Sequence, residues 1–515
     1  MSGRAPAPLP AGAGIAAALV LAALVLGTLA VLALRAEGAA RLGPADLAAL
    51  RFTLWQAALS ALLSVALAVP VARALARRRF PGLGVYVALM GAPFVLPGLV
   101  AVLGLLAVWG RGGWVNAGLT AVGLPPLSPY GAQGVILAHV FLNLPLAVRM
   151  ILDGWAAIPA ERLRLAAALD LPPGTVLRHI EAPMLRTVLP GAALAVFMIC
   201  LTSFAVALTM GGGPRATTME LAIFQAVRFD FDLGRAAVLA AMQVALCAGA
   251  ALVAGAFAAP SGLGAGRGRV AAVPARGRAL VVQDAAVLAL AALFVAAPLA
   301  AVAWRGATGL ATMPDAVWPA AARTLGVALA AAGLAVGGAV ALGLAALRRP
   351  WVEAAGMLPL AASPLVLGTG LFVILFPLVD PARVALPVAV AINASLGVPF
   401  ALRILMPPLR EAAATQGRLA AALGLPPGVT LRRVILPALR RPLGLALGLC
   451  AALAAGDLGA IALFAREGGE TLPLLVQRLM GAYRMEAAAG AGLVLVTLAF
   501  GLFAVFDLWG RRAAS

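Results

Sequence analysis

The sequence predicts an all-α polytopic membrane protein with about 12 transmembrane helices in two homologous six-helix bundles. Hydrophobic residues fill 63% of the 515 positions and charged residues only 11%, whereas a soluble domain carries about a quarter of its residues as charges. The apolar residues form runs of roughly 20, the length of a helix that crosses about 30 Å of hydrocarbon. These runs are too long for barrel strands and lack their alternation, which favours helices. A 22-residue segment that occurs twice indicates the two halves.

Twelve candidate spans emerge from windows of about 19 residues. The first six lie near 14–34, 54–76, 85–108, 132–152, 187–209 and 236–258, and the second six near 280–303, 321–347, 355–376, 384–405, 442–464 and 489–509. The first run follows Arg4 as a signal peptide would, but it is too long for a signal-peptide core, so we expect a span. The predicted domains are 1–258 with a core at about 50–258, a cytoplasmic linker at 259–279, and 280–515 with a core at about 320–509.

The basic residues predict the orientation. The net charge is +19, and all 38 basic residues are Arg, in short clusters at span ends such as Arg77 to Arg79 and Arg348-Arg349. This placement is typical of topology signals and excludes a nucleic-acid groove. With both termini inside, the inner segments hold 25 Arg and the outer segments 13. The positive-inside rule therefore predicts a multi-pass membrane protein with both termini in the cytoplasm.

The sequence gives no sign of catalytic or metal chemistry. The three Cys residues lie inside apolar runs, where they are expected as small buried hydrophobes, and no CxxC motif or Cys/His cluster is present. Gly211 to Pro214 lacks the Lys-Ser/Thr pair and the preceding strand of a phosphate loop, and we expect a flexible outer turn there. No Walker motif is present, so we expect neither an enzyme nor a bound cofactor, and no metal site.

The duplicated segment reads RLAAALDLPPGTVLRHIEAPML at 164–185 and RLAAALGLPPGVTLRRVILPAL at 418–439, with 14 of 22 positions identical without gaps. Further matches include Thr53-Leu54 with Thr324-Leu325. Each half holds an even number of spans, so the repeat is parallel. Both copies lie between long apolar runs, and we name them loop 1 and loop 2.

Each loop is predicted to form two short helices around a turn. In loop 2, Leu419 and Leu423 fall on one helical face. Pro426-Pro427-Gly428 is expected to end this helix. A second helix then presents Leu431 and Val434 between basic residues. Such a surface suits either a groove of a cytoplasmic partner or the lipid headgroups. Lipid requires only amphipathicity, so the duplication favours a pair of identical partners.

The loops resemble the coupling loop of type-I ABC importer permeases, and we therefore name them coupling loop 1 and coupling loop 2. That pattern is EAA, three residues, Gly, nine residues, Ile, one residue and Leu-Pro. In loop 2, Gly424, Val434, Leu436 and Pro437 occupy the Gly, Ile and Leu-Pro positions. Arg418 replaces the Glu of the pattern. In loop 1, Asp170 replaces the Gly and Ala182 the Leu.

The resemblance implies a location in the bacterial inner membrane, partners and contact residues. In loop 1 the implied ATPase contacts are Arg164, Leu165, Leu169, Asp170, Gly174, Leu177, Ile180 and Pro183. In loop 2 they are Arg418, Leu419, Leu423, Gly424, Gly428, Leu431, Val434 and Pro437. The implied partners are a dimer of ATP-binding cassette ATPases, which holds the ATP and Mg²⁺, and a periplasmic solute-binding protein, besides membrane lipid.

Two outer stretches, SFAVALTMGGGPRATTMEL from Ser203 and AGDLGAIALFAREGGETLPLLVQRLMGAY from Ala455, resemble the thiamine permeases. This resemblance implies transport of thiamine and its phosphates. A ferric-iron permease of the same class is the alternative, because no residue by itself selects the substrate. A secondary transporter with parallel six-span repeats is a further alternative, but it needs coupling carboxylates or broken helices at mid-membrane, and apart from Asp457 these are missing.

Few polar residues lie inside the predicted spans. Asp457 lies mid-span, where a charge costs roughly 2.5–3.5 kcal/mol. It is interpreted as a wall of the translocation path or contact for a cation, or else as an Asp paired with Arg or backbone. Asn143 and Asn393 are predicted to donate interhelical hydrogen bonds, and His139 to be packed. The candidate path or gate residues are Asp457, Ser203, Gly211 and Gly212.

Overall fold

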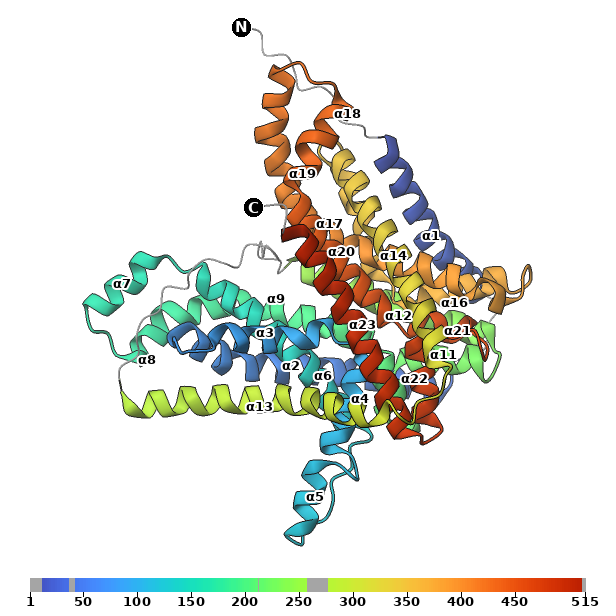
Figure 1. The fold of residues 1–515 in the computed structure, drawn as a ribbon, viewed down its shortest axis with the longest axis horizontal. Helices are drawn as coiled ribbons and strands as arrows, with labels where there is room; N and C mark the ends of the chain where they lie inside the picture. The colour runs from blue at the N-terminus through green and yellow to red at the C-terminus, as the bar shows by residue number, and fades with distance from the viewer. Residues whose placement is uncertain (1–11, 37–41, 212, 257–276, 512–515) are drawn as a thin grey trace. The chain divides into compact units, whose positions relative to one another are not determined.

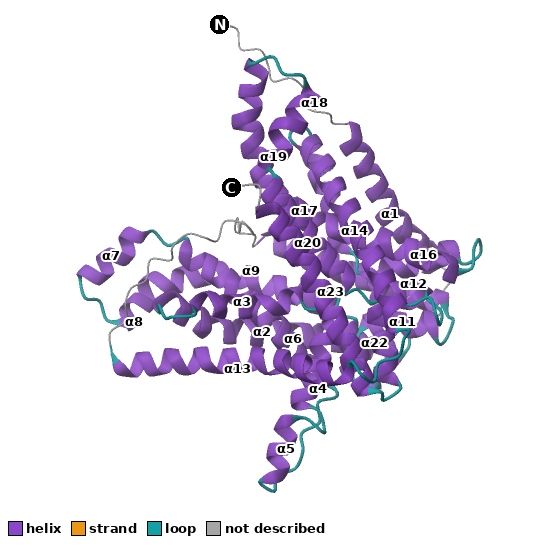
Figure 2. Ribbon diagram, in the orientation of Figure 1, coloured by secondary structure: helices purple, strands orange, loops and turns teal. Residues whose placement is uncertain are grey.

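The computed structural model describes residues 12–36, 42–211, 213–256 and 277–511. Every regular element in these ranges is a helix (Figures 1 and 2). In the same ranges, eleven helices are long and apolar enough to cross a membrane, and the bent pair Pro350–Ala361 and Pro364–Leu375 makes a twelfth when it is taken as one span. The predicted all-α polytopic fold is confirmed. The predicted linker, up to residue 276, lies outside the described residues.

The chain divides into two compact units. The C-terminal unit contains Met1–Leu42, Ala222–Ala248 and Met313–Ser515, and the N-terminal unit contains Gly43–Leu221 and Gly249–Thr312. Helices α11 (Met219–Arg228) and α12 (Leu233–Ala256) each cross a boundary between these segments. The division by contacts therefore differs from the division of the sequence into repeats.

The C-terminal unit contains four long helices, of 25 to 38 residues. Its helices are α1 (Gly12–Ala36), α14 (Val317–Ala346), α15 (Pro350–Met357), α16 (Pro364–Leu375), α17 (Ala385–Ala422), α18 (Pro427–Thr430), α19 (Leu436–Ala438), α20 (Arg440–Ala455), α21 (Gly459–Phe464), α22 (Leu472–Gly481) and α23 (Met485–Arg511). Helix α14 packs on α17 and α20, and α20 packs on α23. Helix α1 packs on α14 and α16, so the first helix of the chain belongs to the unit of the second repeat.

The N-terminal unit is centred on α2 and α6. Its helices are α2 (Pro44–Arg77), α3 (Leu83–Val95), α4 (Gly98–Trp109), α5 (Trp114–Ala121), α6 (Ala132–Ala156), α7 (Ala160–Ala168), α8 (Pro173–Val176), α9 (Ala182–Leu201), α10 (Ala205–Met210) and α13 (Arg278–Gly309). Helix α2 packs on α6 and α9, and α13 packs on α4, α2 and α3. In this unit α7 and α8 lie at one end and α5 at the other (Figure 1).

Small residues allow helices to approach closely where lipid gives no hydrophobic drive for association. A Cβ added at Gly14 of α1 would overlap the Ala341 carbonyl oxygen of α14. A Cβ added at Gly104 of α4 would lie 2.6 Å from the Pro298 carbonyl oxygen of α13. The first long helix of each repeat, α1 or α13, thus packs closely on a neighbouring helix at a glycine.

Several predicted spans are broken rather than continuous. The predicted span 85–108 consists of α3 and α4, separated at Leu96 and Pro97. The predicted span 355–376 bends by 89° before Pro364, where the Ser363 hydroxyl accepts a hydrogen bond from the Val366 amide at 3.1 Å. Proline disfavours helical conformation in the residue before it, which explains both breaks. The prediction of continuous spans was wrong at these positions.

Candidate coupling loops and intramembrane polar clusters

Both coupling loops contain the same order of short elements. In loop 1, α7 is followed by α8, a π-helix at Leu177–Glu181 and the start of α9. In loop 2, the end of α17 is followed by α18, a π-helix at Leu431–Ile435 and α19. π-Helical turns are rare and are frequent at functional sites. The sequence repeat therefore forms the same local backbone twice, including this unusual turn.

The first helix of each loop ends at a residue in the left-handed conformation. Gly424 has φ 70° and Asp170 has φ 45°. In loop 2 the Leu425 amide donates to the Ala420 carbonyl oxygen at 3.0 Å, and in loop 1 the Leu171 amide makes the equivalent bond at 3.0 Å. This is the Schellman arrangement that glycine favours and that Asp tolerates. Asp170 thus departs from the family pattern without changing the backbone.

The Pro-Pro-Gly segments begin the second helix instead of ending the first, so this part of the prediction was wrong. Pro172 and Pro426 are extended, with ψ 150° and 152°, and each lies just before a helix. Pro173 and Pro427 are the first residues of α8 and α18. A proline at the first helical position loses no hydrogen bond and has a suitable φ.

Substitutions at the left-handed position are expected to have opposite effects in the two loops. Asp170→Gly is expected to stabilise the end of α7 by about 0.5–1 kcal/mol, because glycine has no Cβ to strain in this conformation. Gly424→Asp is expected to destabilise the end of α17 by a similar amount. Hydrogen exchange of the Leu171 and Leu425 amides measures both effects. Unchanged exchange at both amides would contradict this assignment.

The loops expose the same leucines. Leu165 and Leu169 are 61% and 62% exposed, and their counterparts Leu419 and Leu423 are 62% and 69% exposed. Beneath them the alanine at the matching position, Ala166 or Ala420, is 2% exposed. Among the other predicted contact residues, Arg164, Asp170, Gly174, Pro183, Arg418, Gly424, Gly428 and Pro437 are exposed, and Leu177, Ile180, Leu431 and Val434 are half-buried. Each loop therefore presents one apolar patch with an arginine beside it.

The fifth and eleventh predicted spans are interrupted at equivalent positions, so the expectation that broken helices are missing was wrong. Helix α9 ends at Leu201 and α10 begins at Ala205, while α20 ends at Ala455 and α21 begins at Gly459. Ser203 and Asp457, which are 254 positions apart like the loops, lie in these interruptions. The sequence did not show this correspondence, because the flanking residues differ between the copies.

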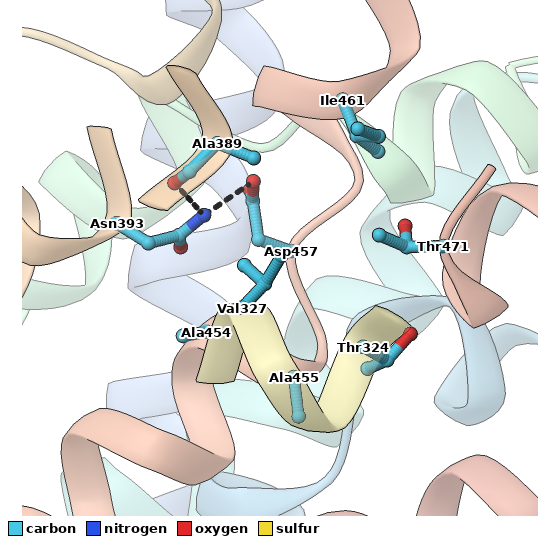
Figure 3. A pocket seen from close by; sticks show the side chains of 9 residues that line it. All are labelled: Thr324, Val327, Ala389, Asn393, Ala454, Ala455, Asp457, Ile461 and Thr471. Atoms are coloured by element: carbon cyan, nitrogen blue, oxygen red, sulfur yellow. Dashed lines mark hydrogen bonds between the residues drawn. The ribbon is translucent and has the colours of Figure 1, made fainter. Parts of the chain in front are cut away.

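Asp457 is held by donors of its own unit, of which Figure 3 shows Asn393. Its carboxylate accepts hydrogen bonds from the Asn393 amide at 3.1 Å and from the backbone amides of Gly459 and Ala460 at 3.2 Å each. The last two bonds cap the N-terminus of α21. The geometry favours the interpretation of a paired carboxylate, with an asparagine and the backbone as partners.

The space beside Asp457 is small. A cavity of about 10 Å³ is lined by Thr324, Val327, Ala389, Asn393, Ala454, Ala455, Asp457, Ile461 and Thr471. This volume holds about one water molecule.

The N-terminal unit has a polar cluster of different chemistry. Asn143 donates to the Cys200 sulfur at 3.6 Å, and Gln56 donates to the Cys200 carbonyl oxygen at 3.1 Å. His139, at the position that matches Asn393, is 1% exposed and lies 3.4 Å from the Ser60 hydroxyl. These contacts confirm that Asn143 and Asn393 donate interhelical hydrogen bonds and that His139 is packed.

The glycine turn after α10 is tightly packed at its start. Gly211 is the residue after α10, and a Cβ added there would lie 2.9 Å from the Ala216 carbonyl oxygen. Gly213 has φ 136°, a conformation that favours glycine. Gly212 lies outside the described residues. The gate role of this turn stays a prediction.

Two threonines have a role that the sequence did not reveal. The Thr53 hydroxyl accepts a hydrogen bond from the Met219 amide at 2.8 Å, and the Thr324 hydroxyl accepts one from the Leu472 amide, also at 2.8 Å. Each threonine thus holds the start of a short amphipathic helix, α11 or α22, against a long helix. The repeated Thr-Leu pairs were the available signal.

Comparison with known proteins agrees with this architecture. No protein-family model matches the chain. The thiamine transport system permease protein ThiP of Brucella abortus (strain 2308) is 40% identical over 536 aligned positions, which cover 99% of this chain and 96% of the relative. ThiP of Escherichia coli (strain K12) is 38% identical, with 90% and 89% covered. The molybdenum transport system permease protein ModB of Azotobacter vinelandii is 32% identical over 178 positions, which are 35% of this chain and 78% of ModB.

The helical fold with a duplicated loop, together with these relatives, defines the class. The protein is a multi-pass permease subunit of the ABC type. Within that class, the chain belongs to the family of ThiP thiamine transport system permease proteins.

Proposed function

We propose that this chain is the membrane subunit of an ATP-driven importer for thiamine and its phosphates. The relatives that cover nearly the whole chain are named for thiamine transport. ATP and Mg²⁺ are held by a separate dimer of ATP-binding cassette subunits, and a periplasmic binding protein delivers the solute. Both partners follow from the class and not from residues of this chain.

The observation that carries the coupling role is the repeated surface of the loops. Leu165 and Leu169 in loop 1 and Leu419 and Leu423 in loop 2 are exposed to nearly the same extent on matching backbones. A dimer of identical ATPase subunits offers the same groove twice, and an exposed apolar patch with a basic rim suits such a groove. Each coupling loop is therefore proposed to dock one ATPase subunit.

The distribution of arginines supports a cytoplasmic position for both loops and both termini. Helix α17 runs without interruption from Ala385 to Ala422 and carries loop 2 at its end. A helix of this length extends over about 57 Å. A displacement of loop 2 is therefore expected to move the distant part of α17 as well. Closure of the ATPase dimer around ATP would then shift the permease between inward-facing and outward-facing states.

Uptake of radiolabelled thiamine into proteoliposomes tests the proposed function. In these vesicles the ATPase subunits and ATP are in the compartment that corresponds to the cytoplasm, and the binding protein and thiamine are on the opposite side. The complete complex is expected to transport thiamine only when ATP is present. Thiamine monophosphate is expected to compete, and ferric iron is not. Uptake of iron with no uptake of thiamine would contradict the proposed substrate and retain the class.

A further inference from the structure

Coupling loop 1 is anchored by a buried group of charges in the N-terminal unit. Arg73 Nε lies 2.7 Å from Glu181 Oε2, and Arg77 Nη2 lies 3.9 Å from the same oxygen. Asp284 contacts Arg78 Nε at 2.7 Å and Arg77 Nη1 at 3.8 Å. The side chains of Glu181, Asp284 and Arg77 are only 7%, 8% and 9% exposed. These ions join the end of α2, the end of the loop 1 π-helix and the first turns of α13.

Arg73 holds the loop at two points. Besides the ion pair with Glu181, its Nη2 donates to the Pro173 carbonyl oxygen at 3.5 Å. Pro173 begins α8, and Glu181 ends the π-helix that follows it. The planar guanidinium group with several fixed donors suits such a double contact better than a lysine would. The whole helical segment from 173 to 181 is therefore fixed to α2.

The equivalent position in the second repeat is apolar. At the spacing of the loops, Glu181 corresponds to Ile435, which is 0% exposed. At the spacing that relates Thr53 to Thr324, Arg73 corresponds to Leu344, which is 4% exposed and belongs to the same buried apolar cluster as Ile435. The loop backbone thus forms with or without charges, and the fold alone does not require the ion pair.

We propose that Glu181 is a positioning residue for coupling. Its ion pairs with Arg73 and Arg77 make loop 1 move together with α2. Because Arg77 also contacts Asp284, the same group of charges connects the loop to α13. Removal of one member of a buried ion pair leaves an uncompensated charge, so a single substitution loosens the loop. In the second repeat, apolar packing of Ile435 has the same role. This inference rests on the proposed docking of the loops to ATPase subunits.

The test exchanges the ionic anchor for the apolar anchor of the second repeat. The variants are Glu181→Ile, Arg73→Leu and the double variant, each purified with the ATPase subunits and placed in proteoliposomes with the binding protein. The readout is thiamine taken up per ATP hydrolysed. Glu181→Ile is expected to lower this ratio about tenfold, within the usual range of coupling effects. The double variant is expected to return it to within about twofold of the wild type, as coupled neighbours do in a double-mutant cycle.

Controls separate positioning from mere stability. Asp507→Asn removes an ion pair between Asp507 and Arg511 of α23, 2.6 Å long, and is expected to leave the ratio unchanged. If Glu181→Ile does not assemble, Glu181→Gln replaces it, since Gln keeps the shape and removes the charge. An unchanged ratio in the single variants, or a folded double variant no better than Glu181→Ile, overturns the inference. Failure of the wild-type chain to bind any ATPase subunit overturns the proposed docking itself.

Discussion

Leu169→Arg together with Leu423→Arg is expected to abolish ATP-dependent thiamine uptake. Both leucines are more than half exposed, at 62% and 69%. Burial of a leucine in a partner contributes about 1.5–3 kcal/mol, and a buried unpaired arginine adds a further cost. The combined change therefore weakens binding of the ATPase subunits by a factor of about 100 or more. Co-purification of the ATPase subunits with the permease measures this loss.

A matched control makes the same Leu→Arg substitution at an exposed leucine outside the coupling loops. Leu378 is 72% exposed and precedes the start of α17, whose other end carries loop 2. Leu378→Arg is expected to leave ATPase binding unchanged. Normal binding by the double loop variant, or an equal loss in Leu378→Arg, would refute the assignment of the loops as docking surfaces.

Asp457→Leu is expected to destabilise the C-terminal unit by about 2–4 kcal/mol, through the lost cap of α21 and an unsatisfied Asn393 amide. Asp457→Ser, which introduces the residue found at the matching position 203, is expected to cost less than about 1 kcal/mol because serine is also a good cap. Thermal unfolding of the purified complex compares the two variants. Equal stability of the Leu and Ser variants would contradict the capping role.

The same position tests whether the charge itself serves transport. Asp457→Asn keeps one oxygen, which can still accept from the Asn393 and Ala460 amides, and loses the bond from the Gly459 amide. Uptake is expected to stay within about twofold of the wild type. A large rise in KM for thiamine with unchanged stability would instead assign the carboxylate to contact with the cationic solute. The two interpretations of Asp457 that the sequence left open are thereby separated.

The sequence predicted the parts of the structure that depend on local chemistry. Apolar runs of about 20 residues specify spanning helices, and the repeat of 14 identical positions specifies two loops of the same form. The prediction extended even to the exposed leucines, since helical spacing fixes the face they share. Asp170 shows the limit of a family pattern, because its backbone is that of Gly424 although its side chain departs from the motif.

The remaining features depend on contacts between distant segments. Helix α1 is apolar on all sides, so its sequence does not show that it packs on α14 in the unit of the second repeat. Glu181 lies within the duplicated loop, but its partners Arg73 and Arg77 are about 100 positions away, and only the fold brings them together. The breaks beside Ser203 and Asp457 lie in runs that are apolar enough to be read as continuous spans.

Site-specific photo-crosslinking from positions 169 and 423 of the assembled complex tests the central claim most directly. The proposed docking predicts that each position forms an adduct with an ATPase subunit, and that a chain labelled at both positions captures two. The same probe at position 378 should give no ATPase adduct. Adducts with lipid alone at both loop positions would contradict the claim and leave the loops as helices that lie on the membrane surface.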